Sequence, residues 1–220
     1  MKYNKDNIVI LIMWPNTDIA YLDIILGPMF SGKTSKLIEI YNYCLNHNIG
    51  IIAINHSLDT RYGKNVITSH DNKSIPCIQV KNLYDIFNNE EYCNKFSEAK
   101  VVLINEGQFF EDLFDFVLYI LEQKFKQIHI CGLDGDFKRC KFGQMLDLIP
   151  HCDNVTKYKA ICKNCSLGEL GLFTHRNSSE EGQISIGSEN YESLCRYCYN
   201  KSKLDEEHLF NYLKKQFKLN

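Results

Sequence analysis

The chain has no hydrophobic run long enough to cross a membrane. The apolar stretch IVILIMW at residues 8–14 is well short of the roughly 20 residues that span a bilayer. Lys2 and Lys5 precede it, and no small-residue cleavage site follows before Pro15, so a signal peptide is not favoured. We expect an N-terminal arm or an extra strand here, and no membrane partner.

Net charge is also nearly absent. The 25 basic side chains almost balance 27 acidic ones, for a formal net charge of -2. Such a chain lacks the basic field that drives non-specific binding to nucleic acid, so we expect no nucleic-acid partner. Repeats and low-complexity tracts are missing too. With 45% hydrophobic and 24% charged residues, 220 residues are enough for one α/β domain and a small appendage.

A phosphate-binding loop is the most specific motif in the chain. Residues 27–34, GPMFSGKT, match the pattern G-x-x-x-x-G-K-[ST]. Glycines let the backbone curl so that successive N–H groups, together with the next helix N-terminus, hold phosphate oxygens. Lys33 would reach the β- and γ-phosphates, and the Thr34 hydroxyl would bind Mg²⁺. The motif predicts binding of a nucleoside triphosphate.

Strand-like and helix-like segments alternate through the first 150 or so residues. Apolar strands are expected at 51–55, 77–80, 100–105 and 127–132, and helices at 35–45, 82–96 and 112–125. A short helix ended by Pro150 follows, and residues 56–74 read as a long surface loop. This pattern predicts a P-loop NTPase-type parallel sheet with helices on both faces.

Acidic residues follow two of these strands. Glu106 comes directly after the strand at 100–105, where ligands of parallel sheets gather, and is the best candidate for a general base. The alternative is a helix N-cap carboxylate without chemistry. Asp59 and Arg61 lie in the loop after the strand at 51–55; without further context they are read as an exposed ion pair.

Two Cys-x-x-Cys pairs mark a change of character after residue 159. Their thiolates can complete a closed tetrahedral zinc site that fastens structure and leaves no position open for catalysis; the four ligands are Cys162, Cys165, Cys195 and Cys198. A redox dithiol is the alternative, but it needs only one pair. The other cysteines are read as core or incidental thiols: Cys44, Cys77, Cys93, Cys131, Cys140 and Cys152.

Four parts of the chain are therefore expected. They are an N-terminal extension (1–20), a nucleotide-binding α/β domain (21–158), a zinc-ribbon domain (159–200) and a tail (201–220). The glycine-rich segment between the Cys pairs would form a lasso-like lid over a bound ligand. The tail has apolar residues at helical spacing, at Phe210, Leu213 and Phe217, and is expected to be an amphipathic helix.

Taken together, these motifs resemble the type II thymidine kinases, the zinc-containing cytosolic enzymes of cells and large DNA viruses. The resemblance runs from about Asp23 to Tyr199. It rests on ILGPMFSGKT, on DTRY at 59–62, SHD at 69–71, EGQFF at 106–110 and LDGDF at 133–137, and on the two Cys pairs.

The resemblance implies transfer of the γ-phosphoryl group of ATP, bound with Mg²⁺, to the 5′-hydroxyl of thymidine or deoxyuridine. It makes Glu106 the base and gives Arg61 a catalytic role, with Thr34 and Asp59 on magnesium. The implied nucleotide-binding residues are Gly27, Pro28, Met29, Phe30, Ser31, Gly32, Lys33, Thr34, Asp59, Thr60, Arg61, Asn105 and Gln108. The implied nucleoside-binding residues are Met29, Phe109, Leu133, Phe137, Phe142, Thr174, Ser185, Ile186, Gly187, Ser188 and Tyr191. A cytoplasmic homotetramer is implied as well.

One departure from this family pattern lies beside the expected base. The family usually carries Asp where this chain has Asn105. This leaves open a regulatory nucleotide-binding protein with weakened catalysis. A zinc-ribbon P-loop ATPase that binds nucleic acid is a further alternative, although the near-neutral charge speaks against it.

Overall fold

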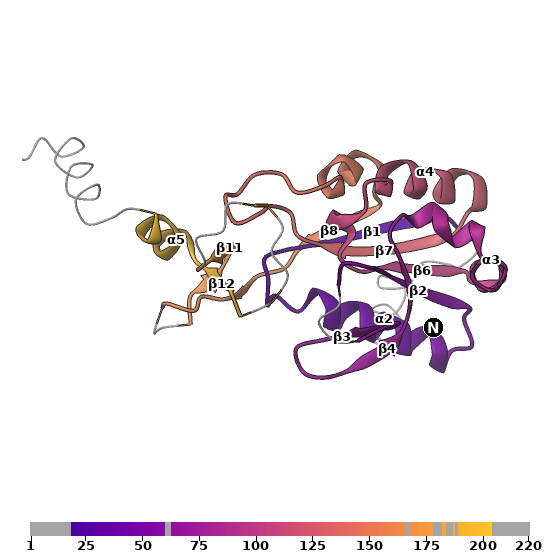
Figure 1. Ribbon diagram of the computed structural model, residues 1–220, viewed down its shortest axis with the longest axis horizontal. Coiled ribbons are helices and arrows are strands. Elements are labelled where there is room, and N and C mark those ends of the chain that lie inside the picture. The colour runs from indigo at the N-terminus through magenta and orange to yellow at the C-terminus, as the bar shows by residue number, and fades with distance from the viewer. Residues whose placement is uncertain are drawn as a thin grey trace, which may run out of the picture.

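A six-stranded parallel sheet forms the centre of the molecule (Figure 1). The computed structural model describes residues 19–59, 63–165, 168–177, 182–183, 187 and 189–203. The strand order is β5-β2-β6-β7-β1-β8, and every pairing is parallel. The strands are β1 (Tyr21–Leu26), β2 (Ile51–His56), β5 (Ile78–Val80), β6 (Val101–Ile104), β7 (Gln127–Gly132) and β8 (Asn154–Lys157). The expected fold class is confirmed.

Each face of the sheet packs against its own hydrophobic cluster. On one face lie α2 (Lys33–Asn46) and the hairpin of β3 (Val66–Thr68) and β4 (Ser74–Pro76). The other face carries the α-helices α3 (Glu90–Glu98) and α4 (Leu113–Lys124) and two 3₁₀ helices, η1 (Leu83–Asn88) and η3 (Met145–His151). Figure 1 shows these two layers below and above the sheet. Burial on both faces explains why the central strands read as continuous apolar runs.

Three local expectations were wrong. The helix expected at 82–96 is broken at Asn89, whose extended backbone ends η1 and whose side chain caps α3 by accepting from the N–H of Tyr92. The loop expected at 56–74 contains β3 and the start of β4, because Ile67 and Ile75 are buried against α2. The short helix expected to end at Pro150 is the 3₁₀ helix η3, which contains Pro150 and ends at His151.

A small second unit follows the sheet and lies at the opposite end of the molecule from α3 (Figure 1). It contains β9 (Ala160–Ile161), β10 (Leu170–Gly171), β11 (Phe173–Arg176), β12 (Tyr191–Leu194) and α5 (Arg196–Ser202). Its strands form two antiparallel pairs, β9 with β10 and β11 with β12. The segments predicted at 8–14 and 204–220 lie outside the described residues. Within the described part of the chain, none of the helices has the length and apolar character that a membrane crossing demands.

Candidate active site

The phosphate-binding loop connects β1 to α2. Its two glycines have positive φ, +148° at Gly27 and +85° at Gly32. A Cβ on Gly27 would lie 2.6 Å from the Tyr158 carbonyl oxygen, so a larger residue does not fit. Inside the loop, Lys33 Nζ donates to the Pro28 carbonyl at 2.7 Å. The lysine is thus folded back over the loop that it closes.

Glu106 sits just beyond the carboxyl end of β6, at the start of η2 (Gly107–Phe109). Its backbone is left-handed, with φ 52° and ψ 45°, a conformation that costs a non-glycine residue roughly 1–2 kcal/mol and is typical of functional sites. Gln108 Nε2 donates to Glu106 Oε2 at 2.7 Å, and Gln108 Oε1 accepts from the Leu133 N–H at 3.0 Å. Gln108 therefore fixes the direction of the carboxylate.

A chain of buried polar side chains joins the loop to the ends of β6 and β2. The Thr34 hydroxyl lies 3.5 Å from Asn105 Oδ1, and Asn105 Nδ2 donates to Asn55 Oδ1 at 3.0 Å. Asn55 Nδ2 in turn donates to Asp59 Oδ2 at 3.1 Å. Asn55 and Asn105 are only 1% and 2% exposed, so their amides are committed to this network. The residues predicted to bind magnesium, Thr34 and Asp59, lie at its two ends.

These groups surround one cavity of about 300 Å³. Its lining includes most of the predicted nucleotide and nucleoside residues: Met29, Phe30, Ser31, Gly32, Lys33, Thr34, Asp59, Glu106, Gln108, Phe109, Leu133, Phe137, Phe142, Thr174, Gly187 and Tyr191. Gly27, Pro28 and Asn105 are not part of this lining, but Pro28 and Asn105 bond to the lining residues Lys33 and Thr34. Thr60, Arg61, Ser185, Ile186 and Ser188 are outside the described residues.

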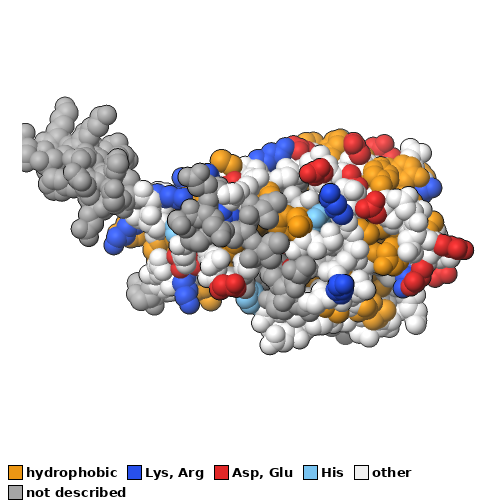
Figure 2. All heavy atoms as spheres, viewed as in Figure 1, with side chains coloured by type: hydrophobic (Ala, Val, Ile, Leu, Met, Phe, Trp, Pro, Cys, Tyr) orange, Lys and Arg blue, Asp and Glu red, His pale blue; other side chains and the backbone are white. Residues whose placement is uncertain are grey.

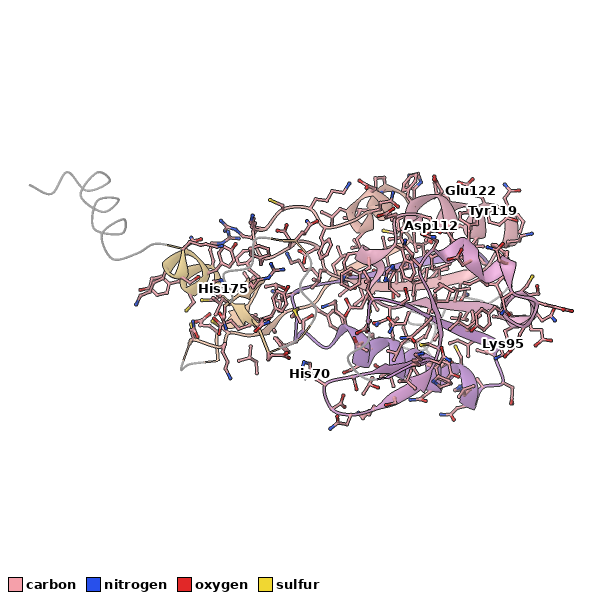
Figure 3. The ribbon with its side chains drawn as sticks, viewed as in Figure 1. His70, Lys95, Asp112, Tyr119, Glu122 and His175 are labelled. Atoms are coloured by element: carbon pink, nitrogen blue, oxygen red, sulfur yellow. The ribbon has the colours of Figure 1, made fainter. Side chains whose placement is uncertain are left out.

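The cavity also has lining residues that were not among the predicted site residues. They are Ser35, Leu58, Thr68, His70, Asp71, Cys131 and Gln183. The His70 ring packs against Phe30 with 4.7 Å between ring centroids, and Figure 3 shows His70 between the sheet and the small unit. Hydrogen bonds from Lys73 and Ser69 lower the pKa of Asp71 to about 2. His70 and Asp71 belong to the SHD motif at 69–71, and the β3–β4 hairpin is the part of the structure that brings them to the cavity.

The four predicted metal ligands converge in the small unit. The sulfurs of Cys162, Cys165, Cys195 and Cys198 all lie within 4.8 Å of one another. Cys165 Sγ is 3.6 Å from Cys195 Sγ and 3.4 Å from Cys198 Sγ. A tetrahedral Zn²⁺ with bonds near 2.3 Å would need sulfurs about 3.8 Å apart, so the cluster fits such an ion.

One thiol of this cluster, Cys162, has a lowered pKa, while neighbouring thiols raise the pKa of Cys165. Burial opposes ionisation of Cys162, but hydrogen bonds from the N–H groups of Cys195 and Asn164 outweigh it and lower the pKa of the Cys162 thiol to about 7. A metal ion binds the thiolate form. The four cysteines could hold one zinc ion, and four thiolate ligands would leave no position on that ion open for catalysis.

Arg176 at the end of β11 is a site residue that the sequence did not reveal. It is 5% exposed, and its guanidinium stacks on Phe137 at 3.9 Å from the ring centroid. It donates to the Tyr191 hydroxyl at 2.6 Å and to the Gln183 carbonyl at 2.8 Å, and also to the carbonyl of Gly182. One buried cation thus joins two described parts of the predicted lid to the cavity wall.

The loop, the strand-end carboxylate and the cavity that they share define a P-loop nucleotide-binding protein. The family model for thymidine kinase matches residues 20–199. The chain is 39% identical over 186 residues to the thymidine kinase of Yaba monkey tumor virus, covering 84% of this chain and 98% of that protein. It is 35% identical to thymidine kinases of Oryza sativa and Bacteroides thetaiotaomicron, covering 81% and 83% of this chain and 65% and 88% of those proteins. The chain belongs to the thymidine kinase family.

Proposed function

We propose that the protein transfers the γ-phosphoryl group of ATP to the 5′-hydroxyl of thymidine, and of deoxyuridine, as a step of nucleotide salvage. The observation that carries this proposal is the shared cavity. Residues 29–34 of the phosphate-binding loop, Glu106 and the described members of the predicted nucleoside contacts line one space of about 300 Å³. The γ-phosphate of ATP and the 5′-hydroxyl of the nucleoside can therefore meet beside a single carboxylate.

Glu106 acts as the general base in this proposal. Phosphoryl transfer depends mostly on positioning and on charge stabilisation, with a residue that accepts the proton of the attacking hydroxyl. Gln108 holds one carboxylate oxygen of Glu106, which directs the carboxylate at an acceptor in the cavity. Lys33 and the loop amides would bind the phosphates, and Arg61 would contribute positive charge next to them.

Magnesium would bind next to Thr34, on the hydroxyl and on the carboxylate of Asp59. The ion would supply charge neutralisation on the donor phosphates. The chain Thr34–Asn105–Asn55–Asp59 holds both proposed ligands in fixed positions before the ion arrives. Thr60 also belongs to the proposed nucleotide-binding set.

The acceptor base would lie against the aromatic and aliphatic wall of the cavity. Phe109 and Phe142 make an edge-on pair with centroids 5.6 Å apart, which gives the wall a rigid apolar face. Met29, Leu133, Thr174 and Tyr191 would complete the pocket, and the segment at 185–188 would read the base edge. Zinc in the cysteine cluster would fasten both ends of this lid.

The proposal also includes a cytoplasmic homotetramer of four such chains. As for the nucleic-acid alternative, Figure 2 shows acidic and basic side chains intermixed over the described part of the visible face. That distribution does not favour a nucleic-acid groove. Regulatory binding without turnover has no specific observation in its favour.

Incubation with ATP, Mg²⁺ and one nucleoside at a time tests the proposal, with the monophosphate product measured. We expect product from thymidine and deoxyuridine. Glu106→Gln should retain ATP binding and lose about 10²- to 10⁴-fold in kcat, as expected for removal of a general base. The exposed Glu111 offers the matched control Glu111→Gln, which should turn over normally. Near-normal turnover of Glu106→Gln would remove Glu106 from the mechanism.

A further inference from the structure

The hairpin β11–β12 of the small unit forms hydrogen bonds with Met29 of the phosphate-binding loop. Thr174 and Ser193 are directly opposite each other in the hairpin and are 3% and 2% exposed. Thr174 Oγ1 accepts from the Met29 N–H at 3.1 Å, and the Ser193 hydroxyl donates to the Met29 carbonyl. Two hydroxyls from the small unit thus hold both backbone polar groups of one loop residue.

These contacts fix two consecutive peptide planes. The Met29 N–H shares a plane with the Pro28 carbonyl, which accepts from Lys33 Nζ at 2.7 Å. The Met29 carbonyl shares the next plane with the Phe30 N–H. Because the C=O and N–H of a trans peptide point in opposite directions, holding the carbonyl on Ser193 turns the Phe30 N–H away from the small unit.

The loop needs such support because its next residue is strained. Phe30 has φ 62°, a left-handed conformation that costs a non-glycine residue roughly 1–2 kcal/mol. Its side chain is 39% exposed, so close packing does not fully offset that cost. A turn of this kind directs successive N–H groups into a concave surface that binds anions. Hydrogen bonds from outside the loop therefore stabilise the conformation that would bind phosphate.

Ser193 is itself tied to the cysteine cluster. Its carbonyl accepts from the N–H of Lys163 at 2.9 Å, and Lys163 lies between the two cysteines of the first pair. Two residues beyond Ser193, the N–H of Cys195 donates to Cys162 Sγ at 3.2 Å. A continuous set of contacts thus runs from the cysteine cluster through Ser193 to the phosphate-binding loop.

We infer that Ser193, with Thr174, is a positioning residue that holds the phosphate-binding loop in its anion-binding conformation. The small unit then has two roles: it carries the lid over the nucleoside, and it supports binding of the triphosphate of ATP. This inference rests on the proposed use of ATP. It assigns the Ser193 side chain a role in donor affinity that its distance in sequence from the loop does not suggest.

The test measures binding of Mg·ATP and, separately, of inorganic tripolyphosphate by calorimetry. Ser193→Ala leaves a buried carbonyl without its donor, and we expect both ligands to bind about 5- to 100-fold more weakly. The KM for thymidine at saturating ATP should change less than about threefold. Thr174→Ser keeps a hydroxyl and should bind tripolyphosphate better than Thr174→Val. The control Ser202→Ala removes a hydroxyl bonded to the Tyr199 carbonyl in the same unit and should bind both ligands normally.

A second measurement does not depend on ligand affinity alone. Because coupling between the binding free energies of two sites is reciprocal, Mg·ATP should raise the metal affinity of the wild type, measured at equilibrium by competition with a chelator, and do so much less in Ser193→Ala. Metal content before chelation should be equal in the two proteins, which separates positioning from misfolding.

The outcomes separate this inference from the proposed function. Affinities of Ser193→Ala within twofold of wild type, or an equal loss in Ser202→Ala, would overturn the inference. If the wild type binds tripolyphosphate but not Mg·ATP, the proposed donor is wrong and the tripolyphosphate series still decides the role of Ser193. A wild type that binds neither contradicts both.

Discussion

The side-chain amide of Asn105 both donates and accepts hydrogen bonds in the site. Its Nδ2 donates to Asn55, while its Oδ1 faces Thr34 and accepts from the Cys131 thiol at 3.1 Å. An aspartate has the same shape but only accepts hydrogen bonds. In this chain, an acid at position 105 would therefore place two acceptor oxygens against each other, at Asn55. The amide at 105 matches the amide at 55.

This pairing gives a prediction for Asn105→Asp. The added charge beside Thr34 should lower the Mg²⁺ concentration needed for half-maximal activity. The lost donor to Asn55 should lower the free energy of unfolding by about 1–3 kcal/mol, the usual cost of an unsatisfied buried polar group. Magnesium titrations and denaturant unfolding measure the two effects. If neither quantity changes, Asn105 has no contact with the metal and the amide pair is not important for stability.

Arg176 allows a similar prediction for the lid. Arg176→Lys keeps the charge, but one ammonium group cannot reach the Tyr191 hydroxyl and the two lid carbonyls in the same planar arrangement. We expect the KM for thymidine to rise about 10-fold or more, since charged hydrogen bonds contribute roughly 1.5–3 kcal/mol each. Steady-state kinetics of this variant provide the measurement.

The matched control for Arg176 is Arg196→Lys. Arg196 lies over the Phe173 ring, 4.9 Å from its centroid, in the same small unit but at its exposed surface. Its replacement should leave the KM for thymidine unchanged. Equal effects of the two substitutions would mean that Arg176 acts only through the general stability of the small unit.

Among the elements, α2 carries a buried thiol that predicts alkaline sensitivity. Burial raises the pKa of Cys44 from 9.0 to about 11. Between these values the unfolded chain loses the thiol proton and the folded chain keeps it, so the free energy of unfolding falls by about 1.4 kcal/mol per pH unit. The stabilisation is complete below pH 9 and disappears as the pH rises through the folded pKa.

Denaturant unfolding between pH 8 and 11 tests this pH dependence. Cys44→Ala should be less stable than wild type at pH 8, because it leaves a cavity, but should lose less stability on going to pH 11. Cys140→Ala removes an exposed thiol and should keep the wild-type slope. A wild-type slope in Cys44→Ala would show that other groups cause the alkaline loss.

The elements also show what the sequence could and could not predict. The phosphate-binding loop and the Cys pairs are local patterns, because their spacing is set by the chemistry they perform. Strand β8 was not predicted: its residues NVTK are all exposed, and the strand exists because it pairs with β1. Ser193, Arg176 and Asn55 were missed for the same reason, since each acts on residues far away in the chain.

On the scale of the whole molecule, metal binding by the cysteine cluster should hold the small unit in its position against the α/β domain. Cys198→Ser should lose the metal, which we expect at about one zinc per chain, and should lower affinity for both thymidine and ATP. Cys152 lies outside the cluster, so Cys152→Ser should retain the metal and both affinities. Elemental analysis with binding titrations would check this, and a metal-free protein with full activity would contradict a structural role for zinc.

The position of β1 in the sheet has a consequence for the order of synthesis. β1 pairs on one side with β7, where Tyr21 faces Gln127, and on the other with β8, where Asp23 faces Asn154. Among the strands of this sheet, β1 is therefore translated first and its two partners last, while β2 can pair with β5 and β6 in the interval. A nascent chain that stops before β7 carries Leu22, Ile24 and Leu26 without neighbours to bury them. The phosphate-binding loop that begins at the end of β1 is thus translated before β7 and β8, and takes its final shape only after both have paired with β1.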